Sequence, residues 1–333
     1  MTLHVQHEPP VRFARRMNAH GNTLAVVLEK PEHLVLSRLA LSAAGESDVV
    51  VDIEWTGIST GTERLLWSGR MPPFPGMGYP LVPGYESVGR IVEVGARSGR
   101  QVGERVFVPG AKCYGEVRGL FGGAAAKVVV PGSRVTTIGE NLREEGVLLA
   151  LAATAYHAVT ASGCTYPDLI VGHGVLGRLI ARLVTALAQR PPLVWEQNPN
   201  RVAGATGYNV IIPESDTRRD YRSICDVSGD SRILDTLINR LAPGGEIVLA
   251  GFYSDPLSFA FPAAFIREAR IRVAAEWREP DIAAVKALID TGRLDLGGLI
   301  THRQEATDAV QAYRTAFTDP SCLKMILDWR AHS

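Results

Sequence analysis

Several features that mark other classes of protein are missing from this sequence. It has only four cysteines, which lie far apart without a CxxC pair, so the pattern excludes a disulfide framework and a structural zinc knot. They are Cys113, Cys164, Cys225 and Cys322. We expect free thiols in a reducing cytoplasm.

Basic and acidic residues balance at 35 each, without a run of lysine or arginine, which argues against a nucleic-acid partner.

No segment has the pattern of a membrane anchor or of a signal peptide. The longest apolar run, 146–161, is short for a bilayer span and carries His157. Residues 1–22 mix arginine, proline and histidine without an apolar centre, so we expect an N-terminal extension before the first strand. A cytoplasmic location is the expectation.

Residues 23–142 alternate short apolar runs with turns. The runs are rich in β-branched residues and bounded by Pro, Gly and Ser; they cover 23–28, 33–39, 48–58, 87–95, 103–110 and 125–132. Strands at this close spacing, without long helices, predict a small β-barrel or sandwich. Between them, 68–86 holds five prolines and four glycines, a density that predicts a loop.

From residue 143 the pattern changes to helices alternating with strands. Helices are expected over 143–162, 176–189 and 231–242, and strands over 169–172, 192–196, 208–213, 223–229, 245–252 and 271–276. Units of this kind predict a parallel, doubly wound sheet and hence an α/β fold over 143–276. Two more helices and a terminal strand are expected in 277–333.

The stretch Gly172-His173-Gly174-Val175-Leu176-Gly177 fits the G-x-G-x-x-G pattern. Alone the pattern is weak, but here it follows an apolar strand and opens an amphipathic helix, the context that dinucleotide binding requires. Gly172 permits the tight turn, Gly174 lets the backbone approach the pyrophosphate, and Gly177 allows close helix–strand packing. The helix N-terminus then offers free N–H groups to the phosphates. His173 is expected to contribute its backbone.

Glu196 ends the next predicted strand, 24 positions after Gly172. A carboxylate there accepts hydrogen bonds from the ribose 2′-hydroxyl and repels a 2′-phosphate, which favours NAD over NADP. Asn198 and Arg201 follow closely and are added to the predicted cofactor site; Arg201 weakens the preference because its charge could attract a phosphate.

Several blocks resemble the medium-chain dehydrogenase/reductase superfamily over nearly the whole chain. They are GISTGTE (57–63), VPGYESVGRIVEVG (82–95), VGERVFVPG (102–110), FGGAAAKVVVP (121–131), the Gly172 turn, GGEIVLAGF (244–252) and LITHR (299–303). The resemblance implies a GroES-like catalytic domain over 23–142, a Rossmann nucleotide-binding domain over 143–276, and a segment 277–333 that returns to the catalytic domain. It also implies a site between the domains, a homodimer, and Thr154, Ser228, Gly251 and Phe252 beside the cofactor.

A closer resemblance is to enzymes that oxidise the 3-(1-hydroxyethyl) group of a (bacterio)chlorophyllide to 3-acetyl with NAD. It is based on the block GISTGTERLLWSGRMPPFPGMGYPLVPGYE and the segments GLFGGAA, LALAATAYHA, DLIVGHGVLGRL and SCLKMILDW, within residues 23–330. The implied substrate is a tetrapyrrole of the chlorophyllide type. Its apolar product is compatible with transient contact with a membrane surface.

Zinc-dependent members of the superfamily carry a Cys, a His-Glu pair and a third ligand. This chain has Ser59 or Thr60, then Tyr85 before Glu86, and Ala150. These side chains do not supply the thiolate and imidazole donors of a tetrahedral zinc site, so no metal is expected.

Oxidation of an alcohol still needs a group that accepts the hydroxyl proton. We keep three candidates open: Tyr85 as acid/base, a hydroxyl relay through Ser59 or Thr62, and His157. A tyrosine would need its pKa lowered by a neighbouring positive charge, which an oxidised nicotinamide could supply. Glu86 is either a member of the site or a purely structural ion-pair partner.

The substrate side is predicted on the proline-stiffened segment 67–80. It offers flat aromatic and methionine surfaces and a cation for a carboxylate: Trp67, Arg70, Met71, Phe74, Met77 and Tyr79, with Arg64 as a second cation. Two alternative functions stay open, a zinc-free NADPH-dependent quinone or enone reductase and a non-catalytic pigment-binding protein. Glu196 argues against the first, and the intact glycine turn argues against the second.

Overall fold

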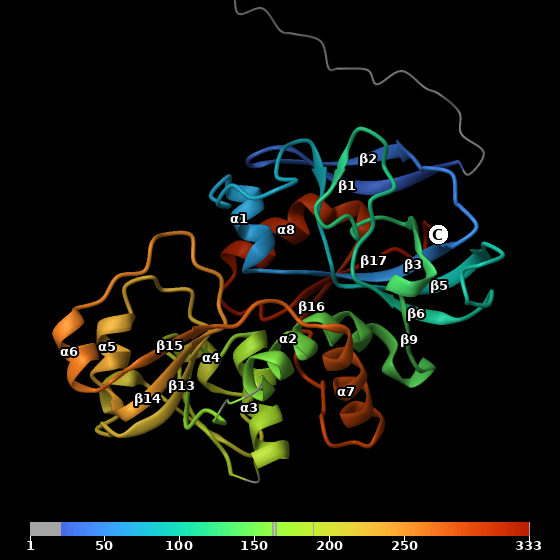
Figure 1. The fold of residues 1–333 in the computed structure, drawn as a ribbon. Helices are drawn as coiled ribbons and strands as arrows, with labels where there is room; N and C mark the ends of the chain where they lie inside the picture. The colour runs from blue at the N-terminus through green and yellow to red at the C-terminus, as the bar shows by residue number, and fades with distance from the viewer. Residues whose placement is uncertain (1–20, 162, 164, 189, 333) are drawn as a thin grey trace, which may run out of the picture.

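The computed structural model describes residues 21–161, 163, 165–188 and 190–332. Figure 1 shows two parts, with the strands of the first third of the chain in one and the alternating helices and strands of the middle in the other. Most of the predicted N-terminal extension, residues 1–20, lies outside the described residues, as does Cys164.

The first part is built from two sheets. One has the strand order β2-β1-β4-β7, and the other has the order β16-β17-β3-β5-β6-β9 with β8 paired to β3. Bounds are β1 (Asn22–Lys30), β2 (His33–Ala40), β3 (Asp48–Ile58), β4 (Leu81–Val82), β5 (Ser87–Val94), β6 (Arg105–Val108), β7 (Arg118–Gly119), β8 (Lys127–Pro131) and β9 (Thr136–Thr137). The helices here are α1 (Thr62–Ser68) and the 3-10 turn η1 (Gly132–Arg134). The six predicted strands are confirmed.

Strand β3 is the centre of this part because it pairs with β5, β8 and β17. Its residues Val49, Val51 and Ile53 are fully buried in the core. The β-branched run therefore forms a strand that has neighbours on both edges, as its continuous apolar pattern predicts.

The second part is a six-stranded parallel sheet of order β12-β11-β10-β13-β14-β15. The strands are β10 (Leu169–Val171), β11 (Leu193–Trp195), β12 (Asn209–Ile211), β13 (Tyr221–Asp226), β14 (Leu241–Leu249) and β15 (Arg270–Val273). The helices are η2 (Glu140–Leu148), α2 (Leu149–Thr160), α3 (Val175–Ala188), α4 (Pro199–Val202), η3 (Pro213–Ser215), α5 (Leu234–Ile238) and α6 (Phe261–Ile266). The order reverses between β10 and β13, and such a switch point opens a crevice at the carboxyl ends of the strands.

The last segment contacts both parts. Helix α7 (Glu279–Asp290) packs on α2. After it come β16 (His302–Glu305), η4 (Ala306–Asp308), α8 (Ala309–Thr318) and β17 (Met325–Asp328). Strand β17 pairs antiparallel with β3, with Ile326 opposite Gly57. Figure 1 shows β17 beside β3, and β16 continues the same sheet on the other side of β17.

Two predicted helices differ from the structure. The α-helix expected over 143–162 begins only at Leu149, and the residues before it form the 3-10 segment η2 instead. Within η2, Arg143 has a non-helical backbone, and its carbonyl accepts a hydrogen bond from the buried Arg105. The helix expected over 231–242 is reduced to α5, and Leu241 already pairs with Tyr221 as the start of β14. In both places tertiary contacts override the local helical pattern. The short helices α1 and α6 were not predicted.

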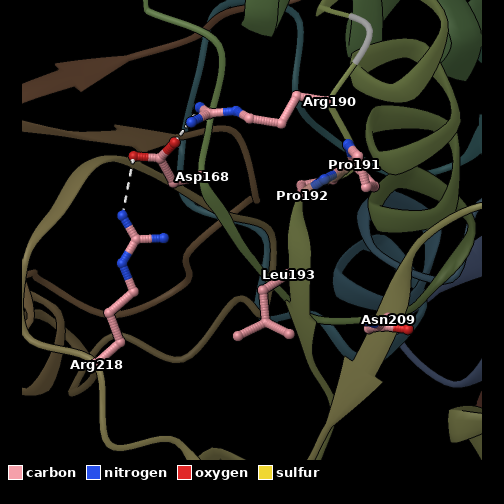
Figure 2. Close-up of a pocket in the computed structure, with 7 residues that line it drawn as sticks. All are labelled: Asp168, Arg190, Pro191, Pro192, Leu193, Asn209 and Arg218. Atoms are coloured by element: carbon pink, nitrogen blue, oxygen red, sulfur yellow. Dashed lines mark hydrogen bonds and ion pairs between the residues drawn. The ribbon is translucent and has the colours of Figure 1, made fainter.

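A charged cluster lies just before β10. The carboxylate of Asp168 contacts Arg190, Arg218 and Arg222, with 3.3 Å from Arg222 Nη2 to Oδ1 and 3.7 Å from Arg218 Nη2 to Oδ2. Figure 2 shows Arg190 and Arg218 reaching Asp168 from opposite sides. Burial alone would raise the pKa of Asp168, but the arginines outweigh it and the pKa is lowered. The cluster joins segments next to β10, β11 and β13 at their amino ends, opposite the crevice.

Candidate functional site: a cleft between two walls

A cleft of about 2190 Å³ is lined by residues of both parts. One wall, here the nucleotide wall, consists of the glycine turn and the strand ends around it. The other, the hydroxyl wall, includes Ser59, Thr60, Thr62 and Tyr85. All residues predicted for the cofactor line this cleft: Thr154, Gly172, His173, Gly174, Val175, Leu176, Gly177, Glu196, Asn198, Arg201, Ser228, Gly251 and Phe252.

The three glycines of the turn meet different constraints. Gly172 has a φ of +102°, which favours glycine. A Cβ on Gly177 would overlap the carbonyl oxygen of Gly172, whereas a Cβ on Gly174 would meet nothing within 4 Å. Gly174 thus leaves open space in front of the N-terminus of α3, whose free N–H groups favour an anion. The cradle fits the pyrophosphate of a dinucleotide.

The carboxylate of Glu196 is held in place at the end of β11. Its Oε2 accepts a hydrogen bond from the backbone N–H of His173 at 2.9 Å, and its Oε1 accepts one from Asn198 at 2.7 Å. Each oxygen retains acceptor capacity for a further donor, such as a ribose hydroxyl. Arg201 directs its Nε to the carbonyl of Pro320, 3.3 Å away, on the other side of the cleft.

His173 has a buried side chain that stabilises the turn from behind. Its Nδ1 lies 2.5 Å from the carbonyl oxygen of Arg201, and its Nε2 lies 2.8 Å from the hydroxyl of Tyr208. A carbonyl only accepts, so Nδ1 carries the hydrogen and Tyr208 donates to Nε2. Burial, together with the charge of Arg178, lowers the pKa of His173 to about 4. The imidazole is therefore neutral at physiological pH and links the turn to the segment 201–208.

The hydroxyl wall is centred on one hydrogen bond. Ser59 Oγ and Tyr85 Oη are 2.7 Å apart, and Thr62 opens α1 beside them. The ring of Phe121 packs edge-on against Tyr85 at 5.3 Å. Burial, and then the charge of Glu86, raise the pKa of Tyr85. The phenol thus stays protonated, and it can pass a proton on but not hold a negative charge.

Four buried polar side chains lie behind these hydroxyls. Lys324 Nζ donates to Glu86 Oε2 at 2.7 Å and to the carbonyl of Ile58 at 3.1 Å. Glu63 accepts from the backbone N–H of Ser59 at 3.0 Å and from the hydroxyl of Tyr313 at 2.6 Å. Burial raises the pKa of Glu63 to about 7 and also raises that of Glu86.

Sequence reasoning missed Glu63, Tyr313 and Lys324. The one available signal was Lys324, a single cation inside the apolar run of SCLKMILDW. Glu86 does not line the cleft but supports its wall from behind.

His157 is not part of the cleft lining either. Its Nδ1 lies 2.9 Å from Asp281 Oδ2, and the pair joins α2 to the first turn of α7. This contact gives His157 a structural role in the packing of the two helices.

None of the six side chains predicted for the substrate lines the cleft. Trp67 packs on Phe317 at 5.7 Å, Met71 is buried in the barrel core, and the hydroxyl of Tyr79 donates to the carbonyl of Leu66 at 2.5 Å. Phe74 and Met77 also pack against this core. Arg70 bonds to Ser254 Oγ at 3.2 Å and lies 3.5 Å from Asp255.

Other aromatic residues line the cleft instead. They are Tyr85, Phe121, Trp195, Phe252, Tyr253, Trp277 and Phe317. They come from widely separated segments, so no local pattern could have predicted most of them together. The cleft therefore has the flat apolar surfaces that were expected on the loop.

Two findings concern metal sites and membrane-spanning helices. Within the described ranges, no three His, Cys, Asp or Glu side chains come together as metal ligands do. No helix among the described residues is both long and apolar enough to cross a bilayer.

Comparisons with known proteins agree with this arrangement. Residues 45–140 match the alcohol dehydrogenase GroES-like domain. A 2-desacetyl-2-hydroxyethyl bacteriochlorophyllide A dehydrogenase from Cereibacter sphaeroides is 55% identical, covering 93% of this chain and 99% of its own. One of the same name from Rhodobacter capsulatus is 54% identical over 92% of this chain and 98% of its own.

Solved structures share the fold at lower identity. A short chain alcohol dehydrogenase from Escherichia coli, complexed with NADH, has a TM-score of 0.79 at 22% identity, covering 92% of this chain and 99% of its own. An L-idonate 5-dehydrogenase from Escherichia coli has a TM-score of 0.80 at 17% identity, covering 92% and 98%.

A GroES-like domain joined to a doubly wound nucleotide sheet defines a member of the medium-chain dehydrogenase/reductase superfamily, and the predicted fold class is confirmed. Within that superfamily, the chain belongs to the family of the 2-desacetyl-2-hydroxyethyl bacteriochlorophyllide A dehydrogenases.

Proposed function

We propose that this protein oxidises the hydroxyethyl group of a bacteriochlorophyllide-type macrocycle to an acetyl group, with NAD as hydride acceptor, in bacteriochlorophyll biosynthesis. The observation that carries the proposal is the Ser59–Tyr85 hydroxyl pair in the same cleft as the glycine turn. The identity to two relatives with that printed name supports the substrate.

The preference for NAD is based on Glu196 and Arg201. The carboxylate of Glu196, fixed by two backbone N–H groups, suits a ribose 2′-hydroxyl and repels a 2′-phosphate. Arg201 keeps its positive charge and donates through Nε to the carbonyl of Pro320, so the preference for NAD is carried by Glu196.

The nucleotide wall serves the hydride transfer, and the hydroxyl wall serves the proton transfer. The Gly172–Gly177 turn and Glu196 would hold the dinucleotide, whose oxidised nicotinamide would supply the hydride acceptor for the alcohol carbon. The hydroxyl proton of the substrate moves to the Ser59–Tyr85 pair as that pair passes its own proton on through Thr62 to water in the cleft. The raised pKa of Tyr85 favours this relay over Tyr85 as an isolated base.

The donors at the hydroxyl wall support a reaction without zinc. The positions that hold Cys and His in zinc-dependent members present hydroxyls and a phenol, and Glu86 is already paired with Lys324. Neutral oxygen donors of this kind do not hold Zn²⁺ at a tetrahedral site.

The test is to give the purified protein the hydroxyethyl bacteriochlorophyllide and NAD⁺ and to record the absorption change that accompanies acetyl formation. Turnover with NAD⁺, and much slower turnover with NADP⁺, is the expected result. Reduction of a quinone by NADPH without oxidation of the hydroxyethyl compound would establish the reductase alternative. Binding of the pigment without any turnover would establish the pigment-binding alternative.

The homodimer stays a proposal with its own support. Among the described strands, β15 pairs only with β14, and it is largely exposed. Beside it, α6 presents Phe261, Phe265 and Ile266 to solvent. A free strand edge next to exposed apolar side chains favours a partner. We expect a dimer by analytical ultracentrifugation and a monomer for Phe261→Glu/Phe265→Glu; a wild-type monomer at micromolar concentration would contradict the expectation.

A further inference from the structure

Most of the cations that line the cleft already have a polar partner. Ion pairs join Lys324 to Glu86, Arg100 to Glu104, Arg232 to Asp230 and Lys286 to Asp290, and Arg201 donates to Pro320. Arg64, Lys112 and Arg134 also line the cleft, and none of the three forms an ion pair within the part of the chain that the structure describes. All three are exposed.

Arg64 lies on the hydroxyl wall itself. It follows Thr62 by two positions in α1, the short helix whose Glu63 and Leu66 are buried. Glu63 is fixed by Ser59 and by Tyr313. Because α1 is anchored through its buried face, Arg64 is held on the face that borders the cleft.

Lys112 lines the same cleft and comes from a different segment, which is joined to the hydroxyl wall through Phe121. The backbone N–H of Ala111, the residue before it, donates to the carbonyl of Phe121 at 2.9 Å. Phe121 in turn packs edge-on against Tyr85. Arg64 and Lys112 are therefore each linked by a short chain of contacts to the Ser59–Tyr85 pair, whereas Arg134 lies in η1 beside the Arg100 contacts.

A bacteriochlorophyllide carries a free propionate on the same flat macrocycle as its hydroxyethyl group. When the hydroxyethyl group meets Ser59 and Tyr85, the carboxylate must lie near the border of the hydroxyl wall or in water. We propose that Arg64 and Lys112 form a carboxylate-binding subsite that orients the macrocycle and selects the free acid over its esters. This inference rests on the proposed function, because it deepens the description of the same substrate.

The physical basis is complementarity of charge. Arginine binds a carboxylate through two parallel N–H donors, and lysine adds a point charge. Exposed pairs gain little, but a flat macrocycle that covers them displaces water and strengthens the interaction. The subsite predicted on Arg70 is already occupied by Ser254 and Asp255, which directs the carboxylate elsewhere.

The experiment compares the acetyl bacteriochlorophyllide, which is the free-acid product, with its methyl ester. Both are titrated into the full-length protein, and binding is followed by pigment fluorescence, so the measurement does not depend on turnover. The wild type should bind the free acid about fivefold to tenfold more tightly than the ester, as a partly desolvated charge pair supports. The ratio should fall towards one in Arg64→Ala/Lys112→Ala and should be partly kept in Arg64→Lys.

Arg38→Ala is the matched control, since it removes an exposed cation on β2 that does not line the cleft. It should keep the wild-type ratio. Equal affinity of the wild type for the acid and the ester would overturn the subsite. A double variant whose affinity for both ligands falls by the same factor would also overturn it. A wild type that keeps the ratio but does not oxidise the hydroxyethyl compound would leave the subsite standing and remove the proposed function.

Discussion

The two walls of the cleft are built in different ways. The nucleotide wall is centred on six consecutive residues, Gly172–Gly177, with Glu196 and Asn198 one strand later. The hydroxyl wall is assembled from distant segments: Ser59 contacts Tyr85, Glu63 contacts Tyr313, and Glu86 contacts Lys324. The first is fixed by local backbone geometry, and the second by tertiary packing of charged and hydroxyl groups.

The two walls also differ in the free energy that it costs to take their polar groups out of water. Glycine at three positions lets backbone atoms do the binding, so few side chains need to be desolvated. The hydroxyl wall takes two carboxylates and an ammonium fully out of water, which is unfavourable unless each finds a partner. We therefore expect substitutions in the first wall to act on cofactor binding, and substitutions in the second to act on stability and on the rate of the chemical step.

Gly177→Ala should have the largest effect on cofactor binding. Its new methyl group would overlap the Gly172 carbonyl and move the turn, so NADH affinity should fall by about 100-fold, as displacement of a binding group by an ångström costs. Fluorescence titration with NADH measures it. Gly174→Ala is the control: it should fold and melt like the wild type, because its Cβ meets no protein atom within 4 Å. Unchanged affinity in Gly177→Ala would refute the assignment of the nucleotide wall.

Lys324→Met should destabilise the fold by about 3–5 kcal/mol, because it leaves the Glu86 carboxylate buried without its cation. Urea unfolding followed by fluorescence gives the free energy of unfolding. The double variant Lys324→Met/Glu86→Gln should recover much of the loss. Lys286→Met, which removes an exposed pair with Asp290, should cost less than about 1 kcal/mol. If both lysine variants lost the same free energy of unfolding, the buried pair would contribute no more to stability than the exposed pair.

Ser59→Ala and Tyr85→Phe should each lower kcat by about 100-fold, the lower range for a group that handles a proton. NADH affinity should not change, since neither side chain belongs to the nucleotide wall. Steady-state kinetics with the hydroxyethyl substrate provides the measurement. A variant that raises KM for NAD⁺ but keeps kcat would show that the two walls are not separable in this way.

Glu63→Gln should produce the smallest and most specific effect, a change in how stability depends on pH. The folded protein raises the pKa of Glu63 from 4.5 to about 7, so between these values it keeps a proton that the unfolded chain has released. The contribution of Glu63 to stability is thus complete below about pH 4.5 and is lost as the pH rises towards 7. The glutamine variant should flatten the decline of Tm over this window. Parallel Tm curves for the two proteins would contradict the assignment.

The contrast between local and tertiary contacts also explains which parts of the site could be predicted from the sequence. The strand–turn–helix pattern around Gly172 and the carboxylate at Glu196 depend on neighbours in the sequence, and the structure places all of the predicted cofactor residues in one cleft. The contacts of Glu63 and Lys324 depend on where β17 and α8 return, which no period or spacing specifies. The segment 67–80 was misinterpreted for another reason. Its aromatic and methionine residues fit a ligand surface and a core surface equally well, and Trp67, Met71 and Phe74 pack against the barrel core.

The pairing of β17 with β3 has a consequence for how the molecule is made. Ile58, whose carbonyl receives the Lys324 ammonium, leaves the ribosome 266 residues ahead of that lysine. Until then Glu86 lacks this cation, and the Trp55–Ile58 end of β3 lacks its partner β17, whereas β8 already pairs the Asp48–Asp52 end. The strands of the parallel sheet around the glycine turn pair with none of those late residues, so their hydrogen bonds can form during synthesis while the half that was translated first waits for β17. The part of the molecule that carries the hydroxyl wall is thus the first to be synthesised and the last to complete its folding.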